Sequence, residues 1–196
     1  MYIGVDLALP GKRRTGIGII DINEHTYYTT TVASQHEIIE IISNNATSKG
    51  GRALVCIDAP LGLPKYGINR MIEITARRRG LRLIPPLLGS MKSLTMYGID
   101  TANKLRQLGI EVFEVHPTST LKILNMSRQE FLNYIRSVLR GSTVNNEHEI
   151  DALVAAFTCL LHDHECTEEI SGYEGEGSLI IPQGGCDLRV IMHGFI

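Results

Sequence analysis

Three apolar segments of this 196-residue chain contain an acidic residue within them or at their end. Asp6 lies in the first segment, Asp58 closes the fourth, and Glu114 lies near the end of the fifth. A carboxylate in an apolar strand is costly unless it reaches a partner, a metal ion or water. Neighbouring strands lie ~4.8 Å apart, so acids at the carboxyl ends of parallel strands could share a divalent ion. Any one of these acids taken alone could equally be a strand end that enters solvent.

A fourth acid lies on the last long helix that the sequence predicts, from Asn146 to about residue 163. His148 and Asp151 are three residues apart, so they share one helical face, and three alanines after Asp151 would let the helix backbone approach a sheet. Acids in a first turn often only complement the helix dipole, which is our interpretation of Glu149. Asp151 lies past that turn. We interpret it as a site residue, with His148 able to activate water or move a proton.

This set of side chains suits phosphoryl chemistry. Hard Mg²⁺ or Mn²⁺ ions prefer oxygen ligands, and two such ions ~3.5–4 Å apart would stabilise the attacking and the leaving oxygen of a phosphodiester. Without metal, the carboxylates would repel one another and the pKa of at least one would rise. We therefore predict a site for two Mg²⁺ or Mn²⁺ ions, with Asp6, Asp58, Glu114 and Asp151 as metal ligands and His148 as a catalytic helper.

The elements that must position these residues form a mixed α/β pattern. Three strands joined by short turns predict an antiparallel meander, and the uninterrupted apolar run 53–58 suits a strand buried on both faces. Capping boxes that begin at Ser34 and Ser127 predict the starts of two helices. The predicted strands are 2–8, 15–22, 26–32, 53–58, 110–115 and 179–181, and the other predicted helices are 66–79, about 100–108 and 146–163, with a loop over 80–98.

The composition excludes some classes of protein. With 43% hydrophobic and 20% charged residues, the chain is not expected to be disordered. No apolar run reaches the ~18 residues that a bilayer span needs, and the first residues lack a signal-peptide pattern. The four cysteines form no Cys-x-x-Cys pair, and Cys56 and Cys159 lie in apolar runs. We therefore expect buried thiols in a reducing cytoplasm.

Two motifs of the chain, one around Asp6 and one that begins at His148, resemble the RNase H-like superfamily, especially Holliday-junction resolvases of the RuvC type. In those enzymes an acid on the first strand, one ending the fourth strand, and a His/Asp-x-x-Asp pair on the last helix bind two metal ions. Asp6, Asp58, His148 and Asp151 occupy the matching positions. The motifs are Gly4-Val5-Asp6-Leu7-Ala8 with Thr15-Gly16, and His148-x-x-Asp151-Ala152-Leu153-x-Ala155-Ala156.

Several short motifs follow one another along the chain. They are Ile57-Asp58-Ala59-Pro60-Leu61, Arg70 with Glu73 and Arg77, Ser90-Met91, Glu114-Val115-His116-Pro117, His148-Glu149-x-Asp151-Ala152-Leu153 and Ile180-Ile181-Pro182. Through the order and spacing of these motifs, nearly the whole chain also resembles the domain of unknown function 429 family, which is described as predicted RNase H-like nucleases.

This resemblance implies a single RNase H-like domain over 1–196, with a five-stranded mixed sheet of order 3-2-1-4-5 and flanking helices. It also implies an insertion at about 60–98 and a short C-terminal extension at about 170–196. The chain departs from the resolvases in two of its acids. Asp58 stands where the resolvases have glutamate, and Glu114 has no counterpart among their ligands. The activity is implied only by analogy, because a fold does not fix a function.

Basic residues near the predicted site are candidates for contacts with phosphate. Lys12, Arg13 and Arg14 follow the first strand, although such a turn could serve only solubility. Arg70 and Arg77 share one helical face with Glu73, either as an internal ion pair or as a phosphate clamp. We add His116, which shares a strand face with Glu114, and so the predicted substrate-binding residues are Lys12, Arg13, Arg14, Arg70, Arg77 and His116.

The leading hypothesis is a metal-dependent nuclease that hydrolyses phosphodiester bonds of DNA or RNA, branched substrates included. With 19 basic and 21 acidic residues, the chain would hold nucleic acid through metal ions and a few arginines, not through a broad basic surface. The alternatives are a nucleotide-binding module of the actin and sugar-kinase type, whose first phosphate loop the segment around Asp6 also resembles, and a catalytically silent RNase H-like interaction module. A membrane partner is not expected, and a homodimer is left open.

Overall fold

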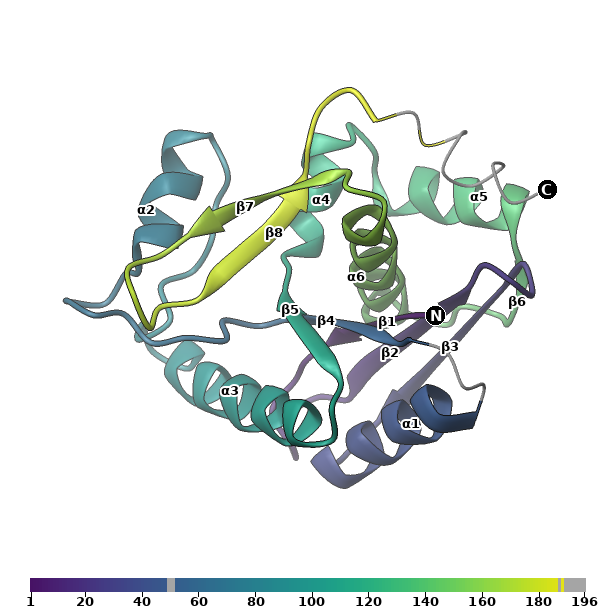
Figure 1. Cartoon of the computed structure of the whole chain (residues 1–196), viewed down its shortest axis with the longest axis horizontal. Coiled ribbons are helices and arrows are strands. Elements are labelled where there is room, and N and C mark those ends of the chain that lie inside the picture. The colour runs from purple at the N-terminus through teal and green to yellow at the C-terminus, as the bar shows by residue number, and fades with distance from the viewer. Residues whose placement is uncertain (49–51, 187, 189–196) are drawn as a thin grey trace.

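The strands pair into one mixed sheet (Figure 1). The computed structural model describes residues 1–48, 52–186 and 188. In chain order the strands are β1 (Tyr2–Asp6), β2 (Thr15–Asp21), β3 (Thr26–Val32), β4 (Leu54–Asp58), β5 (Glu111–Glu114), β6 (Arg140–Gly141), β7 (Thr167–Ser171) and β8 (Ser178–Pro182). Their order in the sheet is β6-β3-β2-β1-β4-β5-β8-β7. Strands β1 to β3 form the predicted antiparallel meander, whereas β1, β4, β5 and β8 run parallel.

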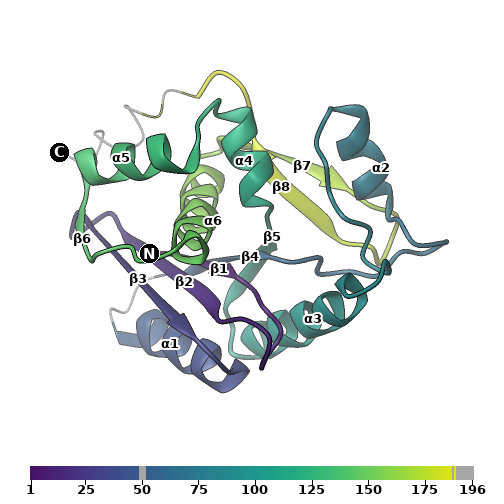
Figure 2. The same ribbon diagram turned by 180° about the vertical axis from the view of Figure 1, so that it is seen from behind.

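Helices cover both faces of this sheet (Figures 1 and 2). They are α1 (Gln35–Ser48), α2 (Met71–Arg78), α3 (Met91–Gln107), α4 (Pro117–Ile123), α5 (Arg128–Val138) and α6 (Glu147–Asp163). Helices α4, α5 and α6 lie on one face and α1 and α3 on the other, each side with its own apolar core. Side chains alternate along a strand, so in β1 Ile3 and Val5 join the core under α1 and α3, while Tyr2 joins the core under α6.

The predicted order 3-2-1-4-5 is confirmed at the centre of the sheet, but the prediction of five strands was wrong. The described residues contain eight strands, because β6 extends one edge and the β8–β7 hairpin extends the other. The predicted strand at 179–181 is part of β8, which pairs with β5 through Leu179 and Glu114. This hairpin is stable at the edge because it buries Ile170 and Leu179 against Ile72 of α2, a contact between segments far apart in the sequence.

The segment 80–98 was predicted as a loop, but α3 already begins at Met91, and the helix predicted at about 100–108 is only its second half. Gly98 weakens a helix by propensity, which is why the sequence favoured a break there. In the fold a Cβ on Gly98 would lie 3.1 Å from the Cβ of Ala59, so the glycine lets α3 pack closely on the segment after β4.

The expectation of free thiols was wrong. Cys56 of β4 is disulfide-bonded to Cys159 of α6, and Cys166 is bonded to Cys186. Packing of α6 on β4 brings the Cα atoms of the first pair to 5.8 Å, within the range that a disulfide requires. The sequence separation of 103 positions between these two cysteines hides this proximity in the sequence. The predicted cytoplasmic location is untested and stays a prediction.

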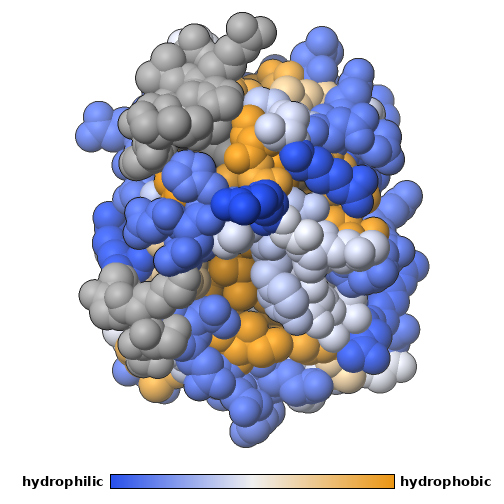
Figure 3. Space-filling view, turned by 90° about the vertical axis from the view of Figure 1, so that its right-hand side faces the viewer, coloured by the Kyte–Doolittle hydropathy of each residue, from blue (hydrophilic) through white to orange (hydrophobic). Residues whose placement is uncertain are grey.

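Two properties of the surface complete the description. Figure 3 shows a side of the molecule on which hydrophilic residues predominate and apolar residues appear in patches between them. In the part of the chain that the structure describes, no helix combines the length and the apolar character that a membrane span requires.

Candidate active site

The site is built on the ends of two adjacent parallel strands. Asp6 is the last residue of β1 and Asp58 the last residue of β4, and the two are register partners. The backbone therefore places both acids at the same edge of the sheet, as the sequence predicted. Open α/β sheets place ligands at this carboxyl edge.

Glycines in β1 and β2 let α6 approach this edge. A Cβ on Gly4 would lie 1.9 Å from the carbonyl oxygen of Ala152, and a Cβ on Gly16 would lie 2.2 Å from that of His148. Gly18, the partner of Gly4 in the ladder, faces the backbone of α6 in the same way. Glycine in a strand often marks such close approach. This signal was present in the sequence, where only the alanines of α6 were used to predict the close packing.

The close approach of α6 puts His148 beside Asp6. The Nδ1 atom of His148 lies 2.6 Å from Oδ2 of Asp6, although 142 residues separate them. Asn146 caps the start of α6 just before His148, because its side chain accepts a hydrogen bond from the backbone N–H of Glu149. The sequence predicted this cap and placed Asp6 and His148 in one site, but it paired His148 with Asp151 and not with Asp6.

Asp151 points toward α5. Arg128, at the start of that helix, donates to both oxygens of Asp151, over 2.8 and 2.7 Å. Sequence reasoning missed Arg128. The residue follows the capping serine Ser127, and nothing in its local pattern sets it apart from a surface arginine. The ion pair raises the pKa of Arg128.

Asp6 and Asp58 lie close together with little positive charge beside them, and their pKa values are raised. Desolvation raises the pKa of Asp6, with the hydrogen bond from His148 acting in the opposite direction. Desolvation and then the negative charge of Asp6 raise the pKa of Asp58 well above its ordinary value. Among the described residues, no hydrogen-bond donor or cation contacts the carboxylate of Asp58.

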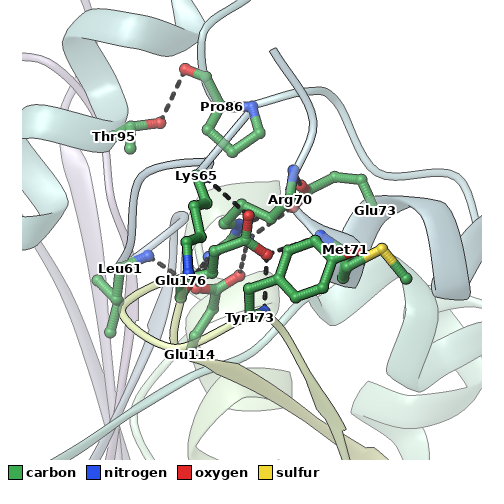
Figure 4. A network of polar contacts seen from close by, with 10 residues as sticks. All are labelled: Leu61, Lys65, Arg70, Met71, Glu73, Pro86, Thr95, Glu114, Tyr173 and Glu176. Carbon is green, nitrogen blue, oxygen red and sulfur yellow. Dashed lines mark hydrogen bonds and ion pairs between the residues drawn. The ribbon is translucent and has the colours of Figure 1, made fainter. Parts of the chain in front are cut away.

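Glu114 lies in a buried ion-pair network with Arg70 and Glu73 (Figure 4). Its two oxygens accept hydrogen bonds from Arg70, and Oε2 also accepts the backbone N–H of Leu61 at 2.7 Å. Arg70 also binds Glu73, and its side chain is completely buried. Of the two interpretations of Arg70, the structure therefore shows the internal ion pair. Desolvation raises the pKa of Glu114, while Arg70 opposes that rise.

Glu176, whose role the sequence left open, joins the same network from the turn between β7 and β8. Its carboxylate accepts the backbone N–H groups of Lys65, Met71 and Tyr173, each at 2.8 or 2.9 Å. Burial would raise the pKa of Glu176, but these hydrogen bonds hold it below its ordinary value. As Figure 4 shows, Glu176 thereby joins the C-terminal hairpin to the segment between β4 and α2.

The predicted substrate-binding residues divide into two groups. Lys12 and Arg13 line a groove of about 400 Å³ that also contacts Asp6 and His148, and His116 lines a second cavity, of about 230 Å³, on Asp6 and Asp58. Burial lowers the pKa of His116. The other three do not line these two spaces. Arg14 donates to the backbone carbonyl of Thr31, Arg70 is buried, and Arg77 is exposed on α2.

Comparison with known proteins identifies the fold. A solved structure, "T. thermophilus RuvC in complex with Holliday junction substrate", matches with a TM-score of 0.54 and 12% sequence identity, over 84% of this chain and 96% of that chain. The chain has the fold of RuvC. No family model matches the chain, and no curated protein matches it. Membership of the domain of unknown function 429 family therefore stays a prediction.

A metal ion at this site of the RuvC-like fold would be held by the acids Asp6, Asp58 and Asp151. The described residues contain no group of three or more His, Cys, Asp and Glu side chains arranged to hold one. His148 and Arg128 instead face Asp6 and Asp151. The donor set nevertheless fits Mg²⁺ or Mn²⁺, because it consists of carboxylate oxygens and because Asp58 has a raised pKa and no cation beside it in the part of the chain that the structure describes.

Proposed function

We propose that this chain is a divalent-metal-dependent nuclease that hydrolyses phosphodiester bonds of DNA or RNA at Asp6, Asp58 and Asp151. The observation that carries the proposal is the carboxylate of Asp58, which lies directly beside Asp6 and has no hydrogen-bond donor or cation as a partner among the described residues. Such an arrangement is unfavourable unless a cation joins it. The RuvC-like fold supports the proposal, since the similar structure was solved with a Holliday junction substrate.

Each residue of the site has a proposed role. Asp6, Asp58 and Asp151 would hold Mg²⁺ or Mn²⁺, and when bound the metal supplies Lewis-acid stabilisation of charge on the phosphate. The carboxylate of Asp6 favours the tautomer of His148 with the proton on Nδ1, which leaves Nε2 as the basic nitrogen that takes a proton from water. Lys12 and Arg13 would contact neighbouring phosphates.

Glu114 was predicted as a metal ligand, and that role is untested. Its oxygens already accept hydrogen bonds from Arg70 and from the backbone N–H of Leu61, three residues after Asp58. In the proposal its first role is therefore to fix the segment that follows Asp58, and so to position that acid.

The direct experiment is cleavage of branched, single-stranded and double-stranded DNA and RNA with Mg²⁺ or Mn²⁺. Asp6→Asn should reduce the rate by ~100-fold or more, because loss of a metal ligand removes several kcal/mol of transition-state stabilisation. Asp100→Asn is the matched control, since Asp100 lies on α3 in an exposed ion pair with Lys104. Equal cleavage by Asp6→Asn and the wild type would exclude this site.

Metal binding can be tested apart from catalysis. Mn²⁺ at 100 times its dissociation constant should stabilise the wild-type fold by ~2.7 kcal/mol, and Asp58→Asn should lose most of this gain. Thermal unfolding with and without Mn²⁺ measures both. An unchanged melting temperature would favour the silent interaction module, and tight ATP binding without cleavage would favour the nucleotide-binding module.

A further inference from the structure

The cavity of about 230 Å³ beside Asp6 and Asp58 has two chemically different parts. One part is apolar and comes from two neighbouring regions of the chain. Leu83 and Ile84 belong to the connection between α2 and α3, and Met91 and Leu94 belong to the first turns of α3. The other part is polar and contains the site acids.

Every charged side chain that lines this cavity is a carboxylate. Besides Asp6 and Asp58 these are Glu73 and Glu114, and the fifth polar lining residue is His116. The buried Arg70 lies behind Glu73 and Glu114 and is not part of the lining. In the proposed function Asp6 and Asp58 hold the metal, and Glu73 and Glu114 are paired with Arg70. The lining contains no lysine or arginine that could bind a phosphate group away from the metal, whereas the remaining lone pairs of Glu73 and Glu114 can accept hydrogen bonds from N–H groups.

The adjoining groove has the opposite character. It shares Asp6, Met91 and Leu94 with the cavity, but its charged lining includes Lys12 and Arg13. A phosphate chain therefore fits the groove, and an uncharged ring with N–H groups at its edge fits the cavity. Because both spaces meet at Asp6, one nucleotide can place its phosphate at the acids and its base in the cavity.

We propose that the cavity receives an unstacked nucleobase next to the scissile phosphate, so that the substrate is a nucleic-acid strand with at least one unpaired nucleotide. This inference rests on the proposed nuclease function and specifies its substrate class. Proteins that take up an extruded base hold it against apolar side chains and read its edge through hydrogen bonds. A fully paired duplex must first lose pairing and stacking, which costs a few kcal/mol, so it is the poorer substrate.

The test uses oligonucleotides that carry a single 2-aminopurine, moved along a single strand, and the full chain with Ca²⁺. Stacking quenches this base, so its fluorescence should rise several-fold at one position when the base enters the cavity. Ile84→Glu should abolish the rise, because it adds a carboxylate to the apolar wall. Leu108→Glu is the matched control, since Ile84 and Leu108 are 56% and 57% exposed and only Ile84 lines the cavity.

Fluorescence anisotropy of the same oligonucleotides reports binding, and cleavage with Mn²⁺ reports activity. Binding and cleavage with no rise at any position would overturn the base cavity and leave the nuclease proposal standing. A rise that persists in Ile84→Glu would also overturn it, because the base would then lie elsewhere. A rise without cleavage would support the cavity and count against the nuclease. No binding at all would overturn both.

Discussion

Asp6 and Asp58 are register partners on the parallel strands β1 and β4, so the backbone itself places their carboxylates at one edge of the sheet. Nδ1 of His148 forms a hydrogen bond with the carboxylate of Asp6, whereas no corresponding group faces Asp58 in the described residues. Of the two carboxylates, Asp6 therefore has a hydrogen-bond partner and Asp58 has none among the described residues.

Asp58→Asn should stabilise the metal-free protein at neutral and alkaline pH. The native pKa of Asp58 is raised, by desolvation and then by Asp6, so the native state holds this proton more tightly than the unfolded state, where the pKa is ~3.9. The contribution of Asp58 to stability is present below that value and is lost as pH rises through the native pKa. The melting temperature of Asp58→Asn in EDTA should exceed that of the wild type at neutral pH, and the difference should shrink toward about pH 4.

Asp100→Asn is the control for this experiment. The pKa of Asp100 is lowered by its hydrogen bonds with Lys104 and Gln35, so its replacement should give no such gain. A gain in Asp58→Asn that does not vary with pH would contradict the explanation.

Arg128→Gln should strengthen Mn²⁺ binding. The guanidinium of Arg128 occupies both oxygens of Asp151, and a metal ion must compete with it. Because the side chain of Arg128 is 40% exposed, we expect a modest gain in affinity of about two- to fivefold. Isothermal titration with Mn²⁺ measures it, with Arg136→Gln on the same helix as the control. Weaker binding by Arg128→Gln would show that the arginine supports the metal site instead.

Gly4→Ala should destabilise the fold and disturb the site. The added Cβ would lie 1.9 Å from the carbonyl oxygen of Ala152 and 2.3 Å from the N–H of Ala156, and helix backbone cannot yield as a flexible side chain can. Overpacking of this kind costs ~1–3 kcal/mol or more. Urea denaturation measures the loss. Gly184→Ala, where a Cβ meets nothing within 4 Å, should denature like the wild type.

Arg70→Met should destabilise the protein by ~3–5 kcal/mol, because it leaves Glu73 and Glu114 buried without a cation. Chemical denaturation of this variant and of Arg78→Met, an exposed residue of α2, tests the difference. The additional changes Glu73→Gln and Glu114→Gln should recover much of the loss. If they recover nothing, the packing of Arg70 and not its charge supports the fold.

The local patterns of the sequence determined much of this protein. Apolar runs that end in acids predicted β1, β4 and β5, and the caps at Ser34, Ser127 and Asn146 are present as predicted. These features depend on residues within a few positions of one another. The spacing of three between His148 and Asp151 likewise predicted neighbouring positions on α6, although in the fold His148 meets Asp6 and Asp151 meets Arg128 of α5.

Only the tertiary structure decided which charged groups meet. Arg128 reaches Asp151 across 23 residues, Arg70 reaches Glu114 across 44, and Cys56 bonds to Cys159 across 103. The same local sequence allows a surface arginine or a buried one, a thiol or a disulfide, because the choice depends on which elements pack together. The sequence predicted the acids of the proposed site, but it did not predict that Arg128 pairs with Asp151. Packing alone sets the distance between charges on separate elements.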